Sequence, residues 1–241
     1  MMYGYRARIG YTSPLASTEV FPYEFYEVVP KGVTLVLTTL AVIDVTAEEV
    51  ARSYEISLHA AEDMARVGVD LLVLGGVPIN VSRGYDHVDD LIRDTETKIG
   101  VPVTTSLTAQ LEALRVTGAR KVAVAHPFPP DAQETMLGDI VGHYGFELAG
   151  IKGGGKGGKE LGRIPLEMSV DLCRTLKRDH PETDTMWLPC PHWAVGEAIA
   201  AIEQELGVTV ITANQAITWH ALRRCGIDDV RPGYGRLLEE F

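Results

Sequence analysis

Asp70-Leu-Leu-Val-Leu-Gly-Gly76 is the stretch that decides the fold, and Asp184-Thr-Met-Trp-Leu-Pro-Cys190 is its counterpart later in the chain. In each stretch an aspartate opens a short apolar run that ends in turn residues. This pattern is typical of a strand buried on both faces of a parallel sheet. The two runs end on different residues, Gly76 in the first and Cys190 in the second. The chain is therefore predicted to contain two related units.

Two further pairs of segments repeat in the same order, which supports this duplication. Residues 8–14 (RIGYTSP) resemble residues 121–127 (KVAVAHP), and residues 99–105 (IGVPVTT) resemble residues 206–212 (LGVTVIT). Helix-like stretches separate the apolar runs. Strands that alternate with helices predict parallel sheets covered on both faces. The expected fold is therefore α/β, with two pseudo-symmetric Rossmann-like lobes that contain parallel sheets.

The apolar pattern also gives the expected elements. The helix at residues 47–67 has Thr46 as its N-cap and Glu49 as the capping-box partner. The expected strands are 7–11, 34–37, 70–74, 102–104, 121–125, 185–188 and 208–211. The other expected helices are 107–117, 195–206 and 216–225.

The repeat sets the expected lobe boundaries. The first lobe is predicted at residues 1–115 plus 218–241, and the second at residues 116–217. Ligands of open α/β sheets bind beyond the carboxyl ends of the strands. The active site is therefore expected in the cleft between the two lobes. The alternative is one doubly wound sheet with chance internal similarity.

Composition narrows the function classes. The 241 residues carry a net charge of −11, which disfavours nucleic acid and anionic membranes as partners. Three cysteines and no CxxC pair predict neither a disulfide framework nor a thiolate metal site, and no cofactor is expected. Without an expected signal peptide or membrane span, the predicted address is the cytoplasm. The expected partner is a small carboxylate substrate, bound by a monomer or small homo-oligomer.

Cys190 is the candidate catalytic residue. It ends a buried strand and precedes a helix expected to begin near Ala194, whose N-terminus would favour the thiolate. His192 lies two residues away and could tune the thiol. A buried core cysteine is the alternative reading. Cys173 and Cys225 fall in helical patterns and are expected to be structural.

The chain resembles the aspartate/glutamate racemase superfamily, most closely its arylmalonate decarboxylase and maleate cis–trans isomerase branch. The resemblance is carried by the Cys190 strand end and by residues 69–84 (VDLLVLGGVPINVSRG), 206–211 (LGVTVI) and 231–237 (RPGYGRL). It implies two catalytic cysteines in racemases and isomerases, one from each lobe. It implies a single second-lobe cysteine, with glycine at the first position, in the decarboxylases. Gly76 and Cys190 match the second arrangement.

The same resemblance implies the substrate contacts. Decarboxylases of this branch place hydroxyl side chains after the glycine and a tyrosine in the second lobe, around the retained carboxylate. This chain has Val77, Pro78 and Phe128 there, which are not side-chain donors. Val42 and Val45 match positions that line an apolar pocket. The candidate replacement donors are Thr12, Ser13, Asn80, Ser82, His126, His192 and the N–H groups of Gly75 and Gly76. Pro14 and Pro191 are further expected contacts.

The glycine-rich stretch Gly153–Lys159 (GGGKGGK) resembles a phosphate loop only in spacing. Glu160 stands where a Ser or Thr would bind magnesium, so nucleotide binding is not predicted. We expect instead a flexible loop that closes over the site.

The predicted function is a cofactor-independent decarboxylase of a malonate-type dicarboxylic acid, in which Cys190 protonates an enolate-like intermediate. The alternative is a cofactor-independent cis–trans isomerase or racemase that combines Cys190 with a non-cysteine partner such as His126. A third hypothesis is a binding or regulatory protein that kept the fold and lost activity, which the missing donors motivate.

Overall fold

The structure is a computed structural model that describes residues 3–16, 18–43, 45–130 and 132–241. The chain forms two compact units, and each gathers segments that are distant in sequence. Unit 1 consists of Met1–Thr18, Val29–Ala109 and Ile217–Asp229, and unit 2 of Glu19–Val28, Gln110–Ala216 and Val230–Phe241.

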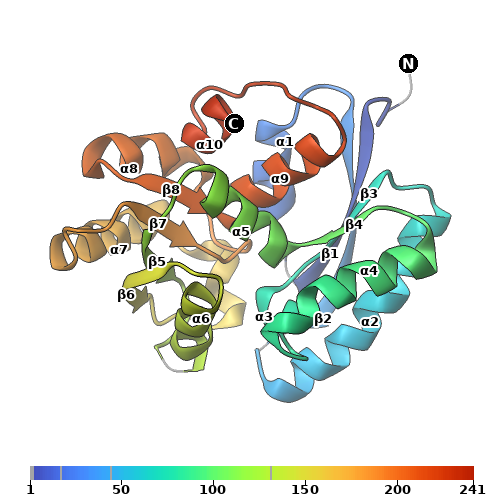
Figure 1. The fold of residues 1–241 in the computed structure, drawn as a ribbon, viewed down its shortest axis with the longest axis horizontal. Helices are drawn as coiled ribbons and strands as arrows, with labels where there is room; N and C mark the ends of the chain where they lie inside the picture. The colour runs from blue at the N-terminus through green and yellow to red at the C-terminus, as the bar shows by residue number, and fades with distance from the viewer. Residues whose placement is uncertain (1–2, 17, 44, 131) are drawn as a thin grey trace. The chain divides into compact units, whose positions relative to one another are not determined.

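Unit 1 is built on a four-stranded parallel sheet in the order β2-β1-β3-β4 (Figure 1). The central strand β3 is buried along its whole length because it is apolar throughout and lies between two neighbours. Its strands are β1 (Ala7–Leu15), β2 (Val33–Val42), β3 (Leu71–Leu74) and β4 (Val103–Thr105).

Unit 2 repeats this arrangement with the order β6-β5-β7-β8, again all parallel. The two orders are equivalent strand by strand, and β5, β7 and β8 arise from the second copies of the repeated segments. This confirms the predicted α/β fold with two related parallel sheets. The strands are β5 (Lys121–His126), β6 (Glu147–Gly153), β7 (Thr185–Leu188) and β8 (Thr209–Thr212).

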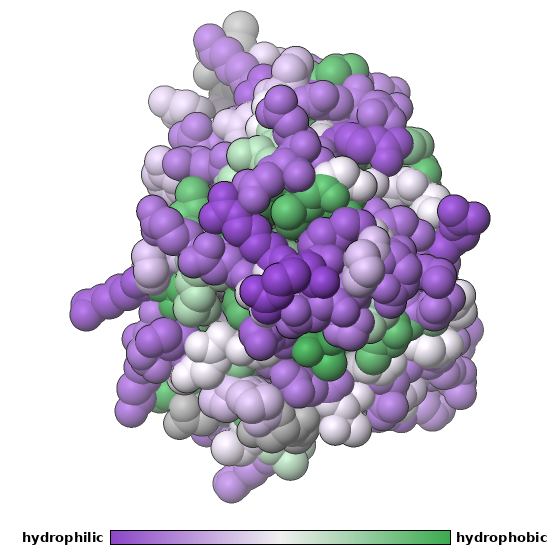
Figure 2. All heavy atoms as spheres, turned by 90° about the vertical axis from the view of Figure 1, so that its left-hand side faces the viewer, coloured by the Kyte–Doolittle hydropathy of each residue, from purple (hydrophilic) through white to green (hydrophobic). Residues whose placement is uncertain are grey.

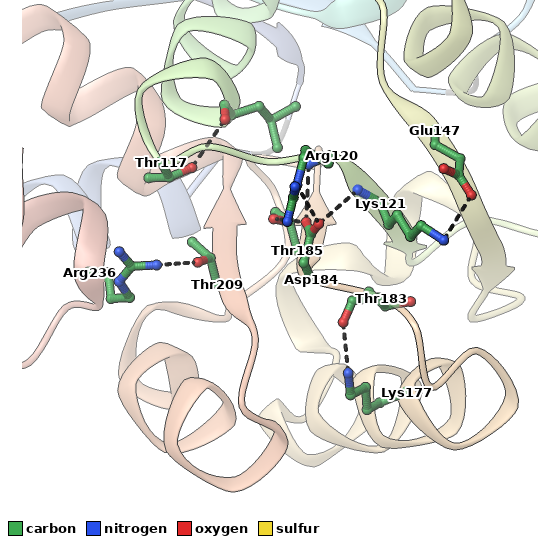
Figure 3. Close-up of polar contacts among 11 residues, drawn as sticks. Thr117, Arg120, Lys121, Glu147, Lys177, Thr183, Asp184, Thr185, Thr209 and Arg236 are labelled. Carbon is green, nitrogen blue, oxygen red and sulfur yellow. Dashed lines mark hydrogen bonds and ion pairs between the residues drawn. The ribbon is translucent and has the colours of Figure 1, made fainter.

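The aspartate at the start of the repeated segment accepts main-chain hydrogen bonds in both units. In unit 1, Asp70 Oδ2 accepts the main-chain N–H of Arg8 (2.7 Å) and so ties the start of β3 to β1. In unit 2, the Asp184 carboxylate accepts the N–H groups of Arg120 and Lys121, both at 3.1 Å (Figure 3). Each aspartate therefore satisfies backbone donors at the amino edge of its sheet, where the ladder has no further strand residue to pair them.

Helices accompany both sheets. The Glu49 N–H donates to Thr46 Oγ1 (3.2 Å), which confirms Thr46 as the N-cap of α2. The helices are α1 (Val20–Val28), α2 (Ala47–Arg66), α3 (Val77–Asn80), α4 (Val88–Ile99), α5 (Ser106–Val116), α6 (Ala132–His143), α7 (Leu166–Asp179), α8 (Ile199–Leu206), α9 (Ala213–Arg224) and α10 (Arg236–Glu240). Short 3₁₀ turns occupy Tyr85–His87, Gly158–Arg163 and Gly196–Ala198.

The last segment of the chain divides between the units. The expected first lobe includes residues 218–241, whereas residues 230–241 pack in unit 2. There Arg236 Nη1 donates to Thr209 Oγ1 (2.8 Å) at the start of β8 (Figure 3). The contacts of residues 230–241 with unit 2 therefore decide where this segment belongs, and the internal repeat contains no information about them.

One strand differs from the expectation. β6 was not predicted, because its sequence ELAGIKG mixes glycine and charge with apolar residues. It lies at the edge of its sheet, paired with β5 alone and largely half-buried or exposed, so it does not need a continuous apolar run.

The surface is mostly polar. Figure 2 shows one face on which hydrophilic side chains predominate and hydrophobic ones form small separate patches. Within the described ranges, no helix has both the length and the apolar character needed to cross a membrane.

Candidate active site

Cys190 lies two residues beyond the end of β7 in unit 2, and only 6% of it is exposed. Burial raises the pKa of its thiol to about 12, although a hydrogen bond from the main-chain N–H of His192 acts in the opposite direction. No α-helix begins between Cys190 and Ile199, so the expected helix N-terminus does not lie directly after the thiol. Cys190 is therefore a protonated thiol near neutral pH, suited to donate a proton.

His192 is the second buried group on this loop. Its side chain is 3% exposed, and neither ring nitrogen has a hydrogen-bond partner in the described structure. Burial lowers its pKa to about 3, so the imidazole is neutral at physiological pH. The next residue, Trp193, is fully buried, and its indole N–H also lacks a partner among the described residues. Such unpaired buried groups cost free energy unless a ligand or water meets them.

His126 ends β5, the strand next to β7 in unit 2. It is fully buried, and its Nε2 lies 3.5 Å from Glu134 Oε1 on α6. Its ring stacks on Phe128 with the ring centroids 6.3 Å apart. His126 ends β5 and Cys190 follows β7, the neighbouring strand of the same sheet, so the two residues belong to the same unit. The charged group beside this strand end is a carboxylate, which does not favour an anion there.

The glycine-rich segment is attached to this strand end. The N–H of Gly154 donates to the His126 carbonyl (2.8 Å), that of Gly155 to Phe128 (3.0 Å) and that of Lys156 to Pro127 (2.7 Å). A Cβ at Gly153 would lie 2.5 Å from the Phe128 carbonyl oxygen, so this close approach requires glycine. The structure thus shows a backbone-anchored turn where the sequence favoured a flexible loop.

In unit 1, the corresponding strand ends are occupied by internal hydrogen bonds. The Gly75 N–H donates to both the carbonyl oxygen (3.1 Å) and the Oγ1 (3.0 Å) of Thr12. Ser13 Oγ donates to Thr18 Oγ1 (2.7 Å), and Ser82 Oγ to the Ile79 carbonyl (2.8 Å). These hydroxyls and the Gly75 amide therefore act within the fold of unit 1.

Asn80 is likewise a structural anchor. Its Nδ2 donates to the Leu74 carbonyl (3.1 Å), and its Oδ1 accepts from Ser106 Oγ (2.9 Å) and the Leu107 N–H (3.3 Å). It ties α3 to the end of β3 and to the start of α5. The replacement donors predicted from the sequence also include two histidines. His126 ends β5, and His192 follows β7.

Gly76 lies two residues beyond β3, as Cys190 lies two residues beyond β7. Its φ is +89°, and a Cβ placed on it would lie 3.0 Å from Pro14 Cβ and 3.1 Å from Ile79 Cδ1. A cysteine at this position would therefore need both a strained backbone and a shift of Pro14.

Gly76→Ala is expected to lower the free energy of unfolding by about 2 kcal/mol, because it adds the contact with Pro14 to the positive-φ penalty. Gly100→Ala is the reference variant with nothing within 4 Å of the added Cβ, and it should lose less stability because Gly100 (φ +68°, ψ +19°) lies in the left-handed helical region whereas Gly76 (φ +89°, ψ +99°) does not. Urea unfolding of both variants measures the difference. Equal losses would show that neither the backbone conformation of Gly76 nor the contact with Pro14 adds a cost.

The remaining predicted contacts lie at strand ends or just beyond them. Pro14 and Val42 are buried at the ends of the paired strands β1 and β2, and Val45 is half-buried before α2. Val77 is buried and Pro78 half-buried in α3, Phe128 is half-buried after β5, and Pro191 is buried beside Cys190. Their roles as substrate contacts stay predictions.

Two glutamates near these loops were not predicted from the sequence. Glu134 reaches His126 from α6, and Glu24 Oε1 accepts the N–H groups of Val195 (2.9 Å) and Gly196 (2.8 Å) after the Cys190 loop. Glu24 acts across a long sequence separation, so no local signal marks it, whereas Glu134 lies close to His126 in the sequence and belongs to no motif that links the two residues. In the described part of the chain, no three His, Cys, Asp or Glu side chains are grouped so as to hold a metal ion.

Comparison with known proteins identifies the family of this chain. The sequence profile of the family described as arylmalonate decarboxylase matches residues 9–238. The chain belongs to the arylmalonate decarboxylase family. The arylmalonate decarboxylase of Bordetella bronchiseptica is 31% identical over 198 residues, covering 81% of this chain and 82% of that one. This confirms the resemblance recognised in the sequence.

Solved structures agree with this membership. A liganded double mutant of arylmalonate decarboxylase matches with a TM-score of 0.90 at 28% identity, covering 98% of this chain and 100% of that one. The maleate isomerase Iso from Pseudomonas putida S16 matches with a TM-score of 0.86 at 22% identity, covering 97% and 98%. The second likeness shows the shared fold. These relatives are enzymes: two are arylmalonate decarboxylases and one is a maleate isomerase.

Proposed function

We propose that this member of the arylmalonate decarboxylase family is a cofactor-independent decarboxylase of malonate-type acids, in which Cys190 protonates the intermediate. The observation that carries the proposal is the buried Cys190 thiol beyond β7, whose pKa burial raises to about 12. Such a thiol holds its proton at neutral pH and can deliver it to a strongly basic carbon.

The reaction needs one proton donor. The bond between the α-carbon and the leaving carboxylate breaks, and its electron pair passes into the retained acyl group. Carbon dioxide departs, and the α-carbon takes the proton of Cys190. The resulting thiolate regains a proton from water. One thiol and no second acid or base are sufficient for this sequence.

The composition of the strand ends favours this reading over inversion at carbon. Inversion requires a base on one face of the substrate and an acid on the other. Gly76 offers no side chain, and Cys173 lies buried in α7. Cys225 follows α9 near Asp70, at the amino edge of the unit 1 sheet. His126 ends the strand next to β7 in the same sheet, and it belongs to unit 2 together with Cys190.

The family comparison supports the glycine and cysteine assignment. The liganded mutant of arylmalonate decarboxylase exchanges a glycine for cysteine and a cysteine for serine. Those two positions are separated by the same number of residues as Gly76 and Cys190. The cytoplasmic location and a monomeric or small homo-oligomeric state stay predictions.

Turnover of substituted malonates in deuterated water tests the proposal. We expect one deuterium to enter the α-carbon for each carbon dioxide released, and none to enter recovered substrate. Mass spectrometry of the product and the remaining acid measures both quantities. Deuterium exchange or isomerisation without carbon dioxide release would instead support a racemase or isomerase. The absence of any conversion across malonates, maleate and small amino acids would support a binding protein.

A further inference from the structure

A cavity of about 320 Å³ lies within unit 2, since all the residues that line it belong to that unit. It is bounded by α1, α10, the turn at Gly196–Ala198 and the start of α9. None of the predicted substrate contacts is among the described residues that line it. Sites for small molecules have volumes of about 300–1,000 Å³, so this cavity is sized for a small compound.

Glu24 on α1 places a carboxylate in the wall of the cavity. Its Oε1 accepts the main-chain N–H groups of Val195 (2.9 Å) and Gly196 (2.8 Å), and its Oε2 accepts Nδ2 of Asn214 (2.7 Å). All three donors are neutral groups. A carboxylate oxygen can accept more than one hydrogen bond, so Oε2 retains capacity for a further donor.

Asn214 at the start of α9 is the unsatisfied polar side chain of this wall. It is 4% exposed, and its Oδ1 has no hydrogen-bond partner among the described residues. The amide orientation is fixed, because only the NH₂ group can face the Glu24 carboxylate. The unpaired atom is therefore an acceptor, which costs free energy until a donor meets it. The neighbouring Gln215, by contrast, uses Nε2 on the Tyr234 carbonyl and Oε1 on the Thr212 N–H.

The charge around the cavity is negative. The exposed residues Glu19, Glu27 and Glu197 also line it, and the described lining residues include no lysine, arginine or histidine. Burial raises the pKa of the Tyr234 phenol, and the Glu27 and Glu197 carboxylates raise it further, whereas Arg231 lowers it. Arg231 donates through Nη2 to the Glu27 main-chain carbonyl (3.1 Å). One arginine does not offset four glutamates, so the cavity favours a cation over an anion.

The rest of the wall is apolar or aromatic. The side chains of Val28, Ile199 and Leu238 are buried there, and Tyr23 and Tyr234 add aromatic rings. Apolar walls favour a hydrocarbon group, and aromatic faces attract cations. The wall therefore suits a ligand with a cationic end and a short apolar body.

We propose that this cavity binds a primary ammonium compound with a short apolar body, whose N–H groups donate to Asn214 Oδ1 and Glu24 Oε2. An ammonium group has three donors and no acceptor, which matches two acceptors that lack a cationic partner. A carboxylate ligand would place a like charge beside Glu24 and would give Asn214 Oδ1 no donor. An alcohol could donate one hydrogen bond but would gain no attraction between charges.

Calorimetric titration at pH 7 tests the inference with three compounds that share a phenethyl body: phenethylammonium, phenethyl alcohol and 3-phenylpropanoate. We expect saturable binding of the ammonium compound at one site per chain, and affinities at least about tenfold weaker for the other two. Asn214→Leu should weaken binding of the ammonium compound by about tenfold or more, because it removes a hydrogen bond to a charged donor.

A second variant keeps the buried wall intact. Glu27→Gln combined with Glu197→Gln removes two exposed charges at the cavity and should weaken binding of the ammonium compound by about threefold. Glu147→Gln combined with Glu182→Gln is the matched control. It changes the net charge equally at exposed positions near the amino ends of β6 and β7, and should leave the affinity unchanged.

The outcomes that overturn the inference are distinct. No saturable binding of phenethylammonium overturns it, as does equally tight binding of all three compounds. Equal weakening by the two double variants would assign the effect to net charge instead of to the cavity. Unchanged affinity in Asn214→Leu removes the hydrogen bond, and if that variant does not fold, the double variants decide. Calorimetry measures binding and not turnover, so failure of the proposed reaction at Cys190 would not alter these results.

Discussion

Cys190→Ala is expected to lower kcat for carbon dioxide release by about 10³-fold, while leaving the protein folded. The substitution removes the proton donor and only one heavy atom from a buried site, so the loss of stability should be close to 1 kcal/mol. The enolate-like intermediate would then wait for a proton from water, which burial of the site restricts. Kinetics of carbon dioxide release on a confirmed substrate measure the effect.

Cys173→Ala is the matched control for this experiment. Cys173 in α7 is fully buried, and burial likewise raises its pKa to about 12. It follows no strand end, so its removal should leave kcat unchanged while costing a similar amount of stability. If Cys190→Ala keeps turnover within tenfold of the wild type, the thiol is not the proton donor.

The pKa direction of Cys190 also separates two mechanisms. If Cys190 acted as a thiolate base, it would first have to lose its proton, which the raised pKa disfavours. If Cys190 acts as a proton donor, it reacts as the neutral thiol that burial favours. The folded form holds the proton more tightly than the unfolded chain. Between pH 9 and 12 this group therefore contributes a progressive loss of stability, and below pH 9 its contribution is constant.

The fold was predictable because its signals are local and repeated. The apolar run after Asp70 and its counterpart after Asp184 identified β3 and β7, and the repeated order identified two sheets of the same topology. Strands buried on both faces must be apolar, so their sequences show them directly. The edge strand β6 has no such requirement, and its sequence gave no comparable signal.

Helix boundaries near the candidate site were less predictable. The pattern after Cys190 favours a helix from Val195, whereas a 3₁₀ turn at Gly196–Ala198 comes first and α8 begins at Ile199. Glu24 on α1 accepts the Val195 and Gly196 N–H groups, which holds this segment in a turn. A contact across so many residues overrides the local helical preference.

The candidate site residues stay predictions, whereas the expected electrostatics of Cys190 differ from those in the structure. The strand-end rule identified Cys190, His126 and His192 from sequence alone. The sequence predicted a thiolate at Cys190 because a helix was expected directly after it. In the structure, burial raises the pKa of this thiol and so favours the protonated form. Burial depends on how many elements cover a loop, and no short window of sequence contains that information.

His192 is expected to make the protein sensitive to acid. Its pKa is about 3 in the folded protein because of burial, whereas an unfolded histidine titrates near 6.5. The unfolded chain therefore binds more protons below pH 6.5, and stability falls as the pH is lowered from 6.5 toward 3. Between pH 7 and pH 4.5 this one group should remove about 2–3 kcal/mol from the free energy of unfolding.

Urea unfolding of the wild type and of His192→Gln at these two pH values isolates this contribution. The variant keeps a neutral polar side chain that does not titrate, so its stability should fall by about 2–3 kcal/mol less than that of the wild type. His59→Gln makes the same chemical change at an exposed position of α2 and should follow the wild type. If His192→Gln shows the wild-type loss, then the His192 imidazole already accepts a proton in the folded protein.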